Sequence, residues 1–483
     1  MSAPGRPKGE FQIAQHEGAP MSAAAAAVSS TANLAYLEPA AFEALAKALL
    51  TPDPAVDRTT LCLDAESSEF LRFNQAALRQ ATGVQQAYLT LAVERGQRRV
   101  ESRLSLGGNP ALDAARLKTE RTLLIGQLDL IADDPWLMRP SSASHSQRDV
   151  RGAQPSAGHL IELVHQHAGR RLKQDFVGFY AAGPVVQALA DSLGSRHWHR
   201  VESFHFEWCH YHRADKAVKT VYAGTHWDDA AFVARLEEAA KRLPLLERTA
   251  HTLKPGAYRV ALAASAVAEL LGTLGWSGFS LKARRTGVSS LMRLQRGEAQ
   301  FASGFHLEEA FAQSTTALFT PEGFTRPASV PLVSAGQLPA SGGTLNSPRS
   351  AAEYGEPANG VDAGESPSAL SLQAGTIAHA DLLKTLDTGL YISNLWYLNY
   401  SDRATCRMTG MTRYACFWVE DGQLMAPVNV MRFDDDALRI FGSGLVGLTD
   451  TPELMPNGDT YGSRRLGSIS TPAAVVDGFA LTL

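Results

Sequence analysis

The alternation of apolar and polar positions predicts an ordered fold that begins near Leu34 and starts with a helix. The segment PAAFEALAKALL (39–50) places Phe42, Leu45, Ala46 and Leu49 at helical spacing. TTLCLD follows as a strand, and AYLTLAVERGQRRVESRLSL (87–106) alternates on both sides of ERGQ, which is typical of a hairpin. The segment 110–131 returns to a helical pattern with one leucine-rich face.

The next part of the chain mixes helices and strands and then becomes rich in short strands. The polar segment 139–158 predicts a loop or linker. HLIELVHQHAG then predicts a helix, DFVGFYAAG and VESFHFEWCHYH predict strands, and 228–243 predicts a further helix. From Lys254 onward the pattern is one of short strands and turns, and the Gly/Ser/Pro/Ala-rich segment 331–375 predicts an extended surface loop.

These patterns predict an α+β fold: an N-terminal α/β domain followed by a largely antiparallel β C-terminal domain. The expected boundaries are a disordered leader at 1–33, the first domain at 34–250 and the second at 251–483. The leader is rich in Ala, Ser and Gly, and Met21 is an alternative start to Met1.

Composition and charge narrow the class of protein. The 483 residues are 45% hydrophobic and 19% charged, and the formal net charge is -4, which argues against a broad nucleic-acid surface. No apolar run approaches the roughly 18 residues of a membrane span. The four cysteines form no C-x-x-C pair, so we expect a reducing cytoplasm.

Histidines are densest in RHWHRVESFHFEWCHYHRADK, which makes metal binding an obvious hypothesis. Strand alternation weakens it, because the side chains divide between two faces. Phe204, Phe206, Trp208, His210 and His212 fall on one face, whereas His205, Glu207 and Cys209 fall on the other. We therefore expect an ordinary half-buried strand and assign no metal ligand in this chain.

Other catalytic signatures are missing, or their residues are explained by an ordinary structural role. The chain has no G-x-S-x-G, so no Ser/His/Asp residues can be assigned, and no catalytic residue is predicted. Cys416 lies in an apolar run that indicates a buried, inert thiol. In RFDDDALRIFG (432–442), Asp434 is expected to cap a helix, with Asp435 and Asp436 in its first turn, rather than to bind a cation.

The segment 388–433 predicts two hairpins, the first turning at SDRATCR and the second at EDG. An exposed strand edge bearing Trp396, Asn399 and Arg413 would suit an extended peptide bound by β-addition. These three are the candidate peptide-groove residues. Sheet core with solvated turns is the alternative reading for each of them.

A strand that leads into a helix is predicted at VALAASAVAELLGTLGW (260–276), where Glu269 is the single ionisable side chain. Leu270, Leu271 and Leu274 share one face, and Ser265 is placed to cap the helix start. The pattern indicates a core helix.

Several long motifs in the chain are specific. They are GLYISNLWYLNYSD (389–402), TGMTR (409–413), EDG (420–422), PVNVMRF (427–433), and two further stretches at 195–224 and 277–292. Together they resemble the TldD/PmbA family, the "modulator of DNA gyrase" peptidases, in which the first four read G-L-x-V-x-x-L-W-Y-x-N-Y-x-D, T-G-M-T-R, E-N-G and P-V-x-x-x-R-F. The resemblance runs from about residue 35 to the C-terminus.

The resemblance implies an N-terminal α/β domain, a β-rich second domain, a dimeric assembly and action on peptides or unfolded segments. Its catalytic TldD branch carries H-E-x-x-x-H on a helix of the second domain and a cysteine zinc ligand near the C-terminus. Here the helix after the Val260 strand has no histidine, and the last cysteine is Cys416. That pattern resembles the TldE/PmbA branch, which lacks the zinc motif.

The expected function is therefore a non-catalytic, substrate-presenting subunit of a TldD/TldE-type metallopeptidase, with zinc in a TldD-like partner. The assembly is a heterodimer with that partner or a homodimer, without nucleic acid or membrane. The alternative is a stand-alone peptide-binding or scaffolding protein without hydrolase activity. A third hypothesis is a hydrolase with a remodelled metal site built from His210, His212 and a distant ligand.

Overall fold

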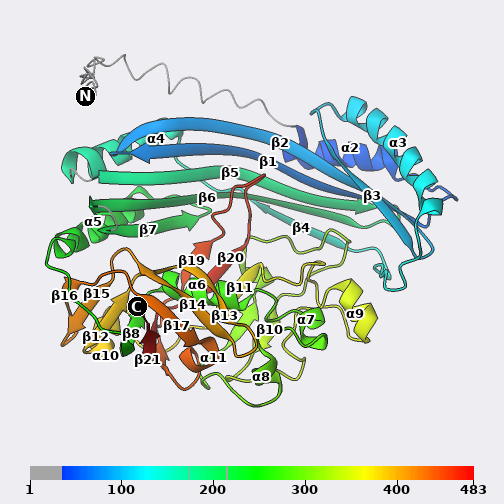
Figure 1. Ribbon diagram of the computed structural model, residues 1–483. Helices are drawn as coiled ribbons and strands as arrows, with labels where there is room; N and C mark the ends of the chain where they lie inside the picture. The colour runs from blue at the N-terminus through cyan, green and yellow to red at the C-terminus, as the bar shows by residue number, and fades with distance from the viewer. Residues whose placement is uncertain (1–34, 173–174, 214–215, 483) are drawn as a thin grey trace, which may run out of the picture. The chain divides into compact units, whose positions relative to one another are not determined.

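The first sheet of the computed structural model is built from long strands that lie side by side (Figure 1). The structure describes residues 35–172, 175–213 and 216–482, so the leader predicted at 1–33 lies outside the described residues. The strands are β1 (Arg58–Asn74), β2 (Ala77–Arg95), β3 (Arg98–Ser105), β4 (His145–Val150), β5 (Asp175–Asp191), β6 (Arg196–Arg213) and β7 (Lys216–Gly224). Their order is β3-β2-β1-β5-β6-β4, with β7 also paired to β6.

Neighbouring strands of this sheet are antiparallel except for the β4–β6 pair. The predicted hairpin is confirmed, because β2 and β3 turn at Gly96 between Arg95 and Arg98. Part of the predicted loop at 139–158 is instead strand β4, which runs parallel to β6 from His145 to Val150. The sequence of β4 is too polar to predict a strand, and its pairing with β6 stabilises it.

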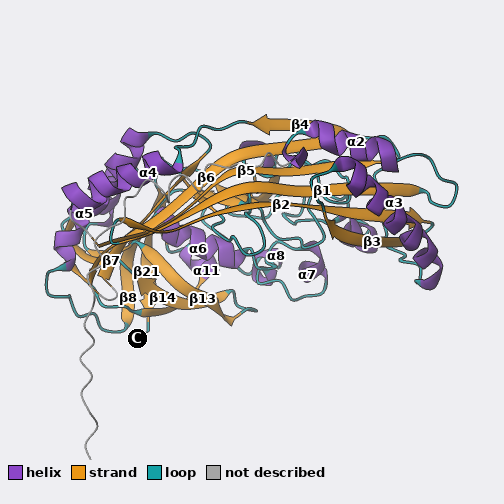
Figure 2. Ribbon diagram, turned by 90° about the horizontal axis from the view of Figure 1, so that it is seen from above, coloured by secondary structure: helices purple, strands orange, loops and turns teal. Residues whose placement is uncertain are grey.

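Helices cover one face of the first sheet (Figure 2). Near one end, α2 (Pro39–Leu49) and α3 (Pro110–Gln127) pack on Leu61, Leu63 and Leu89. Near the other end, α4 (Ala157–Val164) and α5 (Asp229–Leu246) pack on an aromatic cluster of the sheet. The remaining helical turns of this half are η1 (Ala35–Leu37), η2 (Leu128–Leu130) and the π-helical η3 (His165–Arg171).

The second half of the chain forms two further sheets, which are built from shorter strands. One has the order β13-β14-β17-β21-β8-β12-β15-β16, with β18 paired to β21, and the other has the order β10-β9-β11-β20-β19. The strands are β8 (Gly256–Leu262), β9 (Leu307–Glu309), β10 (Val330–Val333), β11 (Ala369–Leu372), β12 (Gly389–Ile392), β13 (Asn394–Asp402), β14 (Arg407–Arg413), β15 (Phe417–Glu420), β16 (Gln423–Pro427), β17 (Arg432–Asp436), β18 (Leu445–Leu448), β19 (Glu453–Pro456), β20 (Ser468–Thr471) and β21 (Ala474–Leu481).

Helix α6 (Ala264–Leu274) follows β8, as the sequence predicts, and its buried face enters a core shared with both of these sheets. The other helices here are α7 (Leu281–Arg285), α8 (Met292–Gln295), η4 (Phe311–Gln313), α9 (Pro348–Tyr354), η5 (His379–Asp381), α10 (Leu382–Leu386) and α11 (Ala437–Ile440). The two predicted hairpins are β13–β14 and β15–β16. The α+β class with a mostly β C-terminal part is confirmed.

The predicted surface loop at 331–375 is wrong. Leu332 and Leu345 are fully buried, α9 and β11 lie inside this segment, and the Glu365 carboxylate is enclosed. Glu365 accepts hydrogen bonds from the backbone and hydroxyl of Ser347 and from the hydroxyl of Ser280. The segment is core because distant parts of the chain cover it.

Two predicted helix caps are displaced. Asp436, not Asp434, caps α11 by accepting from the backbone N–H of Leu438, since β17 continues through Asp436. Ala263 occupies the N-cap of α6, and the Ser265 hydroxyl donates instead to the backbone oxygen of Ser393.

The first sheet draws on residues 58–224 and the other two draw on 256–481, while the domain boundaries at 34–250 and 251–483 stay a prediction. Among the described residues, no helix has the length and apolar character needed to cross a membrane.

Candidate functional site

A cleft of about 760 Å³ lies between the first sheet and the C-terminal half of the chain. Its walls are the face of β6 and β7 that the helices leave uncovered, one side of α6, and the connection between β19 and β20. Alternation along the first sheet explains the arrangement. Phe204 and Phe206 point to the helix side, so His205 and Glu207 point to the cleft.

The sheet wall of the cleft carries an ion pair beside a histidine. Lys219 Nζ lies 2.9 Å from Glu207 Oε2. His205 is 9% exposed, and this burial lowers its pKa although the nearby Glu207 carboxylate opposes the shift. At neutral pH this wall therefore offers a neutral imidazole and a paired, nearly cancelled set of charges.

The helix wall is contributed by α6, which turns Ala268, Glu269, Gly272 and Thr273 toward the cleft. Glu269 is the only ionisable side chain of α6, and neither Ala268 before it nor Thr273 four residues after it can bind zinc through an imidazole. Glu269 remains open to the cleft, but the surrounding walls remove part of its hydration and raise its pKa.

A zinc ion does not fit the donors of this wall. Zinc in peptidases is held by three protein ligands, whereas α6 contributes a single carboxylate. Across the described part of the chain, no group of three or more His, Cys, Asp or Glu residues is arranged to hold a metal ion.

The connection between β19 and β20 crosses from the C-terminal half to the first sheet (Figure 1). Arg464 is 8% exposed and donates to the backbone oxygens of Gly183 and Ser203 at 2.8 and 2.9 Å. Gly458 lies against His205, where an added Cβ would come within 2.8 Å of the imidazole Cε1. A larger residue at position 458 would therefore force the His205 imidazole to shift.

The candidate peptide residues lie on or beside the edge strand β13, not among the residues that line the cleft. The Arg413 guanidinium stacks 4.0 Å from the centre of the Trp396 ring, so the structure brings these two together. Trp396 is 51% exposed, and Asn399 lies beyond an irregularity in the β13–β14 pairing. Asn394, at the start of the same strand, does line the cleft.

The histidine-rich strand has the two faces that its alternation predicts. His210 is fully buried in contact with Phe176, and neither of its ring nitrogens has a hydrogen-bond partner in the described chain. Burial lowers the pKa of His210 to about 4, and His212 is exposed. A remodelled metal site that joins these two residues gains no support.

The sequence predicts that Cys416 is buried, and the structure confirms this. Its thiol is 2% exposed and donates to the backbone oxygen of Arg413, and burial raises its pKa. A protonated, enclosed thiol is a poor nucleophile.

Comparison with solved structures shows the same fold in three proteins. TldE from Thermococcus kodakarensis has a TM-score of 0.74 at 13% identity, covering 92% of this chain and 100% of its own. A candidate modulator of a DNA gyrase from Thermotoga maritima has a TM-score of 0.69 at 13% identity, covering 88% and 96%. A candidate modulator of DNA gyrase from Bacteroides thetaiotaomicron has 0.68 at 14%, covering 92% and 98%. Comparison with curated protein sequences gives no match.

Residues 255–483 match the family model described as the PmbA/TldA metallopeptidase C-terminal domain. This part of the chain belongs to the PmbA/TldA metallopeptidase C-terminal domain family. The match includes α6, β13 and the β19–β20 connection, but it leaves out the sheet wall formed by β6 and β7.

Sequence reasoning missed most of the residues that form the cleft. Lys219, Glu269 and Arg465 come from three distant segments, and only Glu269 drew notice in the sequence. The signal that was available is the alternation in β6, which assigns His205 and Glu207 to a common face.

Proposed function

We propose that this chain is a TldE/PmbA-like subunit of a TldD/TldE-type metallopeptidase, and that it holds an unfolded peptide without cleaving it. The observation that carries the proposal is the cleft between the first sheet and α6, which is large enough for several residues of extended chain but is lined on α6 by one carboxylate and no imidazole. Binding and cleavage are then divided between two subunits.

The groups in the cleft favour a peptide as the ligand. Asn394, Asn457 and the backbone of the glycine-containing β19–β20 connection supply neutral hydrogen-bonding groups, and Trp276 and Ile469 supply apolar surface. The edge strand β13 begins at this cleft and extends away from it. A peptide that leaves the cleft along β13 would add a strand to the sheet and meet Trp396.

The roles of this chain's residues are binding and orientation. The Glu207–Lys219 pair and the anchored Arg464 keep the walls fixed, and neutral His205 offers hydrogen bonding without a competing charge. Zinc, if the assembly uses it, belongs to the TldD-like partner, and no step in this chain depends on it.

Co-purification with a TldD-like chain that carries H-E-x-x-x-H, followed by assays of unfolded-peptide cleavage and zinc content, tests the proposal. We expect cleavage only when the partner is present, and zinc only in the partner. Cleavage with stoichiometric zinc in the lone chain would refute it. A stable homodimer that binds peptides and ignores every TldD-like chain would instead favour the stand-alone scaffold.

A further inference from the structure

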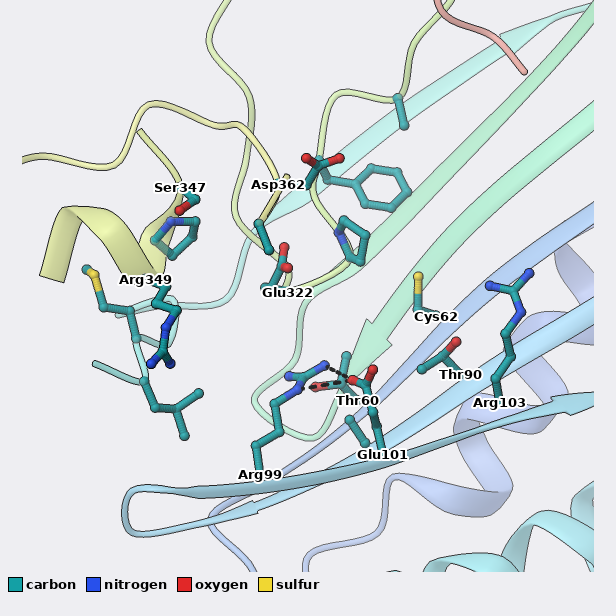
Figure 3. Close-up of a pocket in the computed structure, with 18 of the residues that line it drawn as sticks. Thr60, Cys62, Thr90, Arg99, Glu101, Arg103, Glu322, Ser347, Arg349 and Asp362 are labelled. Carbon is teal, nitrogen blue, oxygen red and sulfur yellow. Dashed lines mark hydrogen bonds and ion pairs between the residues drawn. The ribbon is translucent and has the colours of Figure 1, made fainter. Parts of the chain in front are cut away.

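A second cavity of about 620 Å³ adjoins the cleft. It lies along the face of the first sheet that the helices leave uncovered. The two spaces share four lining residues, which are Gln187, Ala317, Arg326 and Asp362. Figure 3 shows the two walls of this cavity, with Thr60, Cys62 and Thr90 on the strands and Glu322, Ser347 and Asp362 on the C-terminal segments. It has no role in the site described above.

The arginines of this cavity are held by other groups. Arg99 pairs with Glu94 and Glu101, Arg103 pairs with Asp64 at 2.9 Å, and Arg349 pairs with Asp134. Arg326 lies 3.9 Å from Asp362 and donates to the backbone oxygen of Ala317.

Among the carboxylates that line this cavity in the described chain, only Glu322 has no ion pair within 4 Å. Within the described ranges its side chain has no hydrogen bond and no ion pair within 4 Å, and Oε2 is buried, while its charge acts at longer range on Arg326. A buried carboxylate oxygen without a partner is costly, and a cationic ligand would remove that cost.

The backbone at Glu322 is fixed in place. It sits at the tip of a turn closed by the Phe319–Thr325 bridge, and its backbone oxygen accepts from Arg58 at 3.0 Å. Arg58 is 1% exposed and is held by Asp191 at 2.8 Å. Phe319 stacks on His197 with 4.8 Å between ring centres, so the turn is fastened to the first sheet at both points.

Thr60 supplies a second, independent polar group. It is 1% exposed, it lines the same cavity from β1, and its hydroxyl has no hydrogen-bond partner in the described chain. Apolar side chains complete the lining, and they are Trp136, Leu137, Met138, Phe319 and Pro348. The cavity therefore joins an apolar wall to an unpaired carboxylate and an unpaired hydroxyl.

We propose that this cavity is a subsite for an alkylammonium group, the side chain of a lysine in the bound peptide. The inference rests on the peptide-binding function proposed above. An ammonium carries three donors and one positive charge, which match the Glu322 carboxylate and the Thr60 hydroxyl, and its methylene stem matches the apolar wall. Because the cavity opens into the cleft, the peptide backbone lies in the cleft while the lysine side chain enters the cavity.

Nα-acetyl-lysine methylamide is the probe, and Nα-acetyl-norleucine methylamide has the same stem without the charge. NMR titration of the full chain should show the lysine probe binding at least about tenfold more tightly than the norleucine probe, as expected for a charge-assisted hydrogen bond in a partly buried site. A short lysine-free peptide with a free N-terminus separates a lysine side chain from a terminal amine as the source of the ammonium group.

Glu322→Gln should weaken binding of the lysine probe about tenfold or more, and Thr60→Val should weaken it by a smaller factor. Neither change removes a hydrogen bond seen in the structure, so both variants should melt at the wild-type temperature. Glu247→Gln, at the exposed end of α5, is the matched control and should bind like the wild type.

Equal binding of the two probes, or a Glu322→Gln variant with wild-type affinity for lysine, would overturn the subsite. Preference for the lysine-free peptide's terminal amine would overturn its assignment to a side chain. The proposed function fails separately: if long unfolded peptides do not bind but the lysine probe still does, the alkylammonium site stands and the peptide-holding role is refuted.

Discussion

Arg464 Nη2 lies 2.9 Å from the backbone oxygen of Ser203 and 2.8 Å from its hydroxyl oxygen, although the two residues are 261 positions apart. The same guanidinium reaches the backbone oxygen of Gly183 at 2.8 Å. Burial lowers the pKa of Arg464 to about 10, so the side chain stays charged at neutral pH. One cation therefore ties the β19–β20 connection to two strands of the first sheet.

Replacing Arg464 with Met should destabilise the protein by about 2–3 kcal/mol, because three acceptors lose a charged donor in a buried setting. Urea unfolding measures the loss, and hydrogen exchange should show faster exchange at 457–467. Arg465→Met is the control, since Arg465 is exposed and its loss should leave stability near the wild-type value. Equal effects of the two substitutions would show that Arg464 is no anchor.

Trp396→Ala should weaken binding of an unfolded peptide about tenfold, as is usual for an exposed aromatic at the centre of a contact. Trp396 is 51% exposed, so the loss of its stacking with Arg413 should cost only about 0.5–1 kcal/mol of stability. Fluorescence anisotropy with a labelled peptide measures the affinity. Tyr461→Ala removes an aromatic that is 90% exposed on another segment and should change nothing. Unaltered affinity in Trp396→Ala would remove β13 from the binding surface.

The elements that the sequence predicts well are those decided by local chemistry. The turns at Gly96 and at 420–422 follow from their own residues, and the two faces of β6 follow from alternation. Helix α6 follows from its leucine spacing. In each case neighbouring residues carry enough information to choose the conformation.

The elements that the sequence predicts poorly depend on distant partners. Strand β4 alternates between exposed and half-exposed positions, so only its parallel pairing with β6 marks it as a strand. The cleft residues Lys219, Glu269 and Arg465 line one space only because three remote segments fold together. Local composition does not indicate which distant segments come into contact. The segment around Glu365 is mispredicted for the same reason, because distant parts of the chain bury it.

Glu365→Ala should destabilise the protein by about 3–5 kcal/mol, because the 3% exposed carboxylate organises donors from two segments that would be left buried. Those hydrogen bonds outweigh desolvation and lower the pKa of Glu365, so its contribution is present above its unfolded pKa and is lost as pH falls. Chemical unfolding at pH 7 measures the effect. Glu356→Ala removes a surface ion pair with Arg285 and should cost at most about 1 kcal/mol. An unchanged free energy of unfolding in Glu365→Ala would show that the Glu365 carboxylate does not stabilise this segment.

Chelation should leave the isolated chain unchanged. The described residues hold no cluster of metal ligands, so EDTA or phenanthroline should not shift the melting temperature beyond about one degree, whereas loss of a structural zinc removes several kcal/mol. Differential scanning fluorimetry and elemental analysis of the purified chain provide the measurement. A large drop in melting temperature, with zinc released in proportion, would contradict the division of labour proposed for the two subunits.

His210 should make the protein sensitive to acid. Burial lowers the pKa of His210 from 6.5 to about 4, so below pH 6.5 the unfolded chain takes up a proton that the folded chain refuses. Stability from this group is therefore complete above pH 6.5 and is lost as pH falls toward 4, by about 3 kcal/mol in total. Burial also lowers the pKa of His197 and His199 to about 4, which adds to the slope.

His210→Leu should remove the part of the acid-induced loss of stability that comes from His210, because leucine fills the aromatic pocket without a titratable group. The free energy of unfolding should fall by about 2–3 kcal/mol less than in the wild type when pH is lowered from 7.5 to 4.5. Denaturant unfolding at the two pH values gives the comparison, and His212→Gln, which changes an exposed histidine on the same strand, should retain the wild-type slope. A His210→Leu variant with an unchanged slope would mean that His210 already binds its proton in the folded protein, and the burial of its unpartnered nitrogens would then need another explanation.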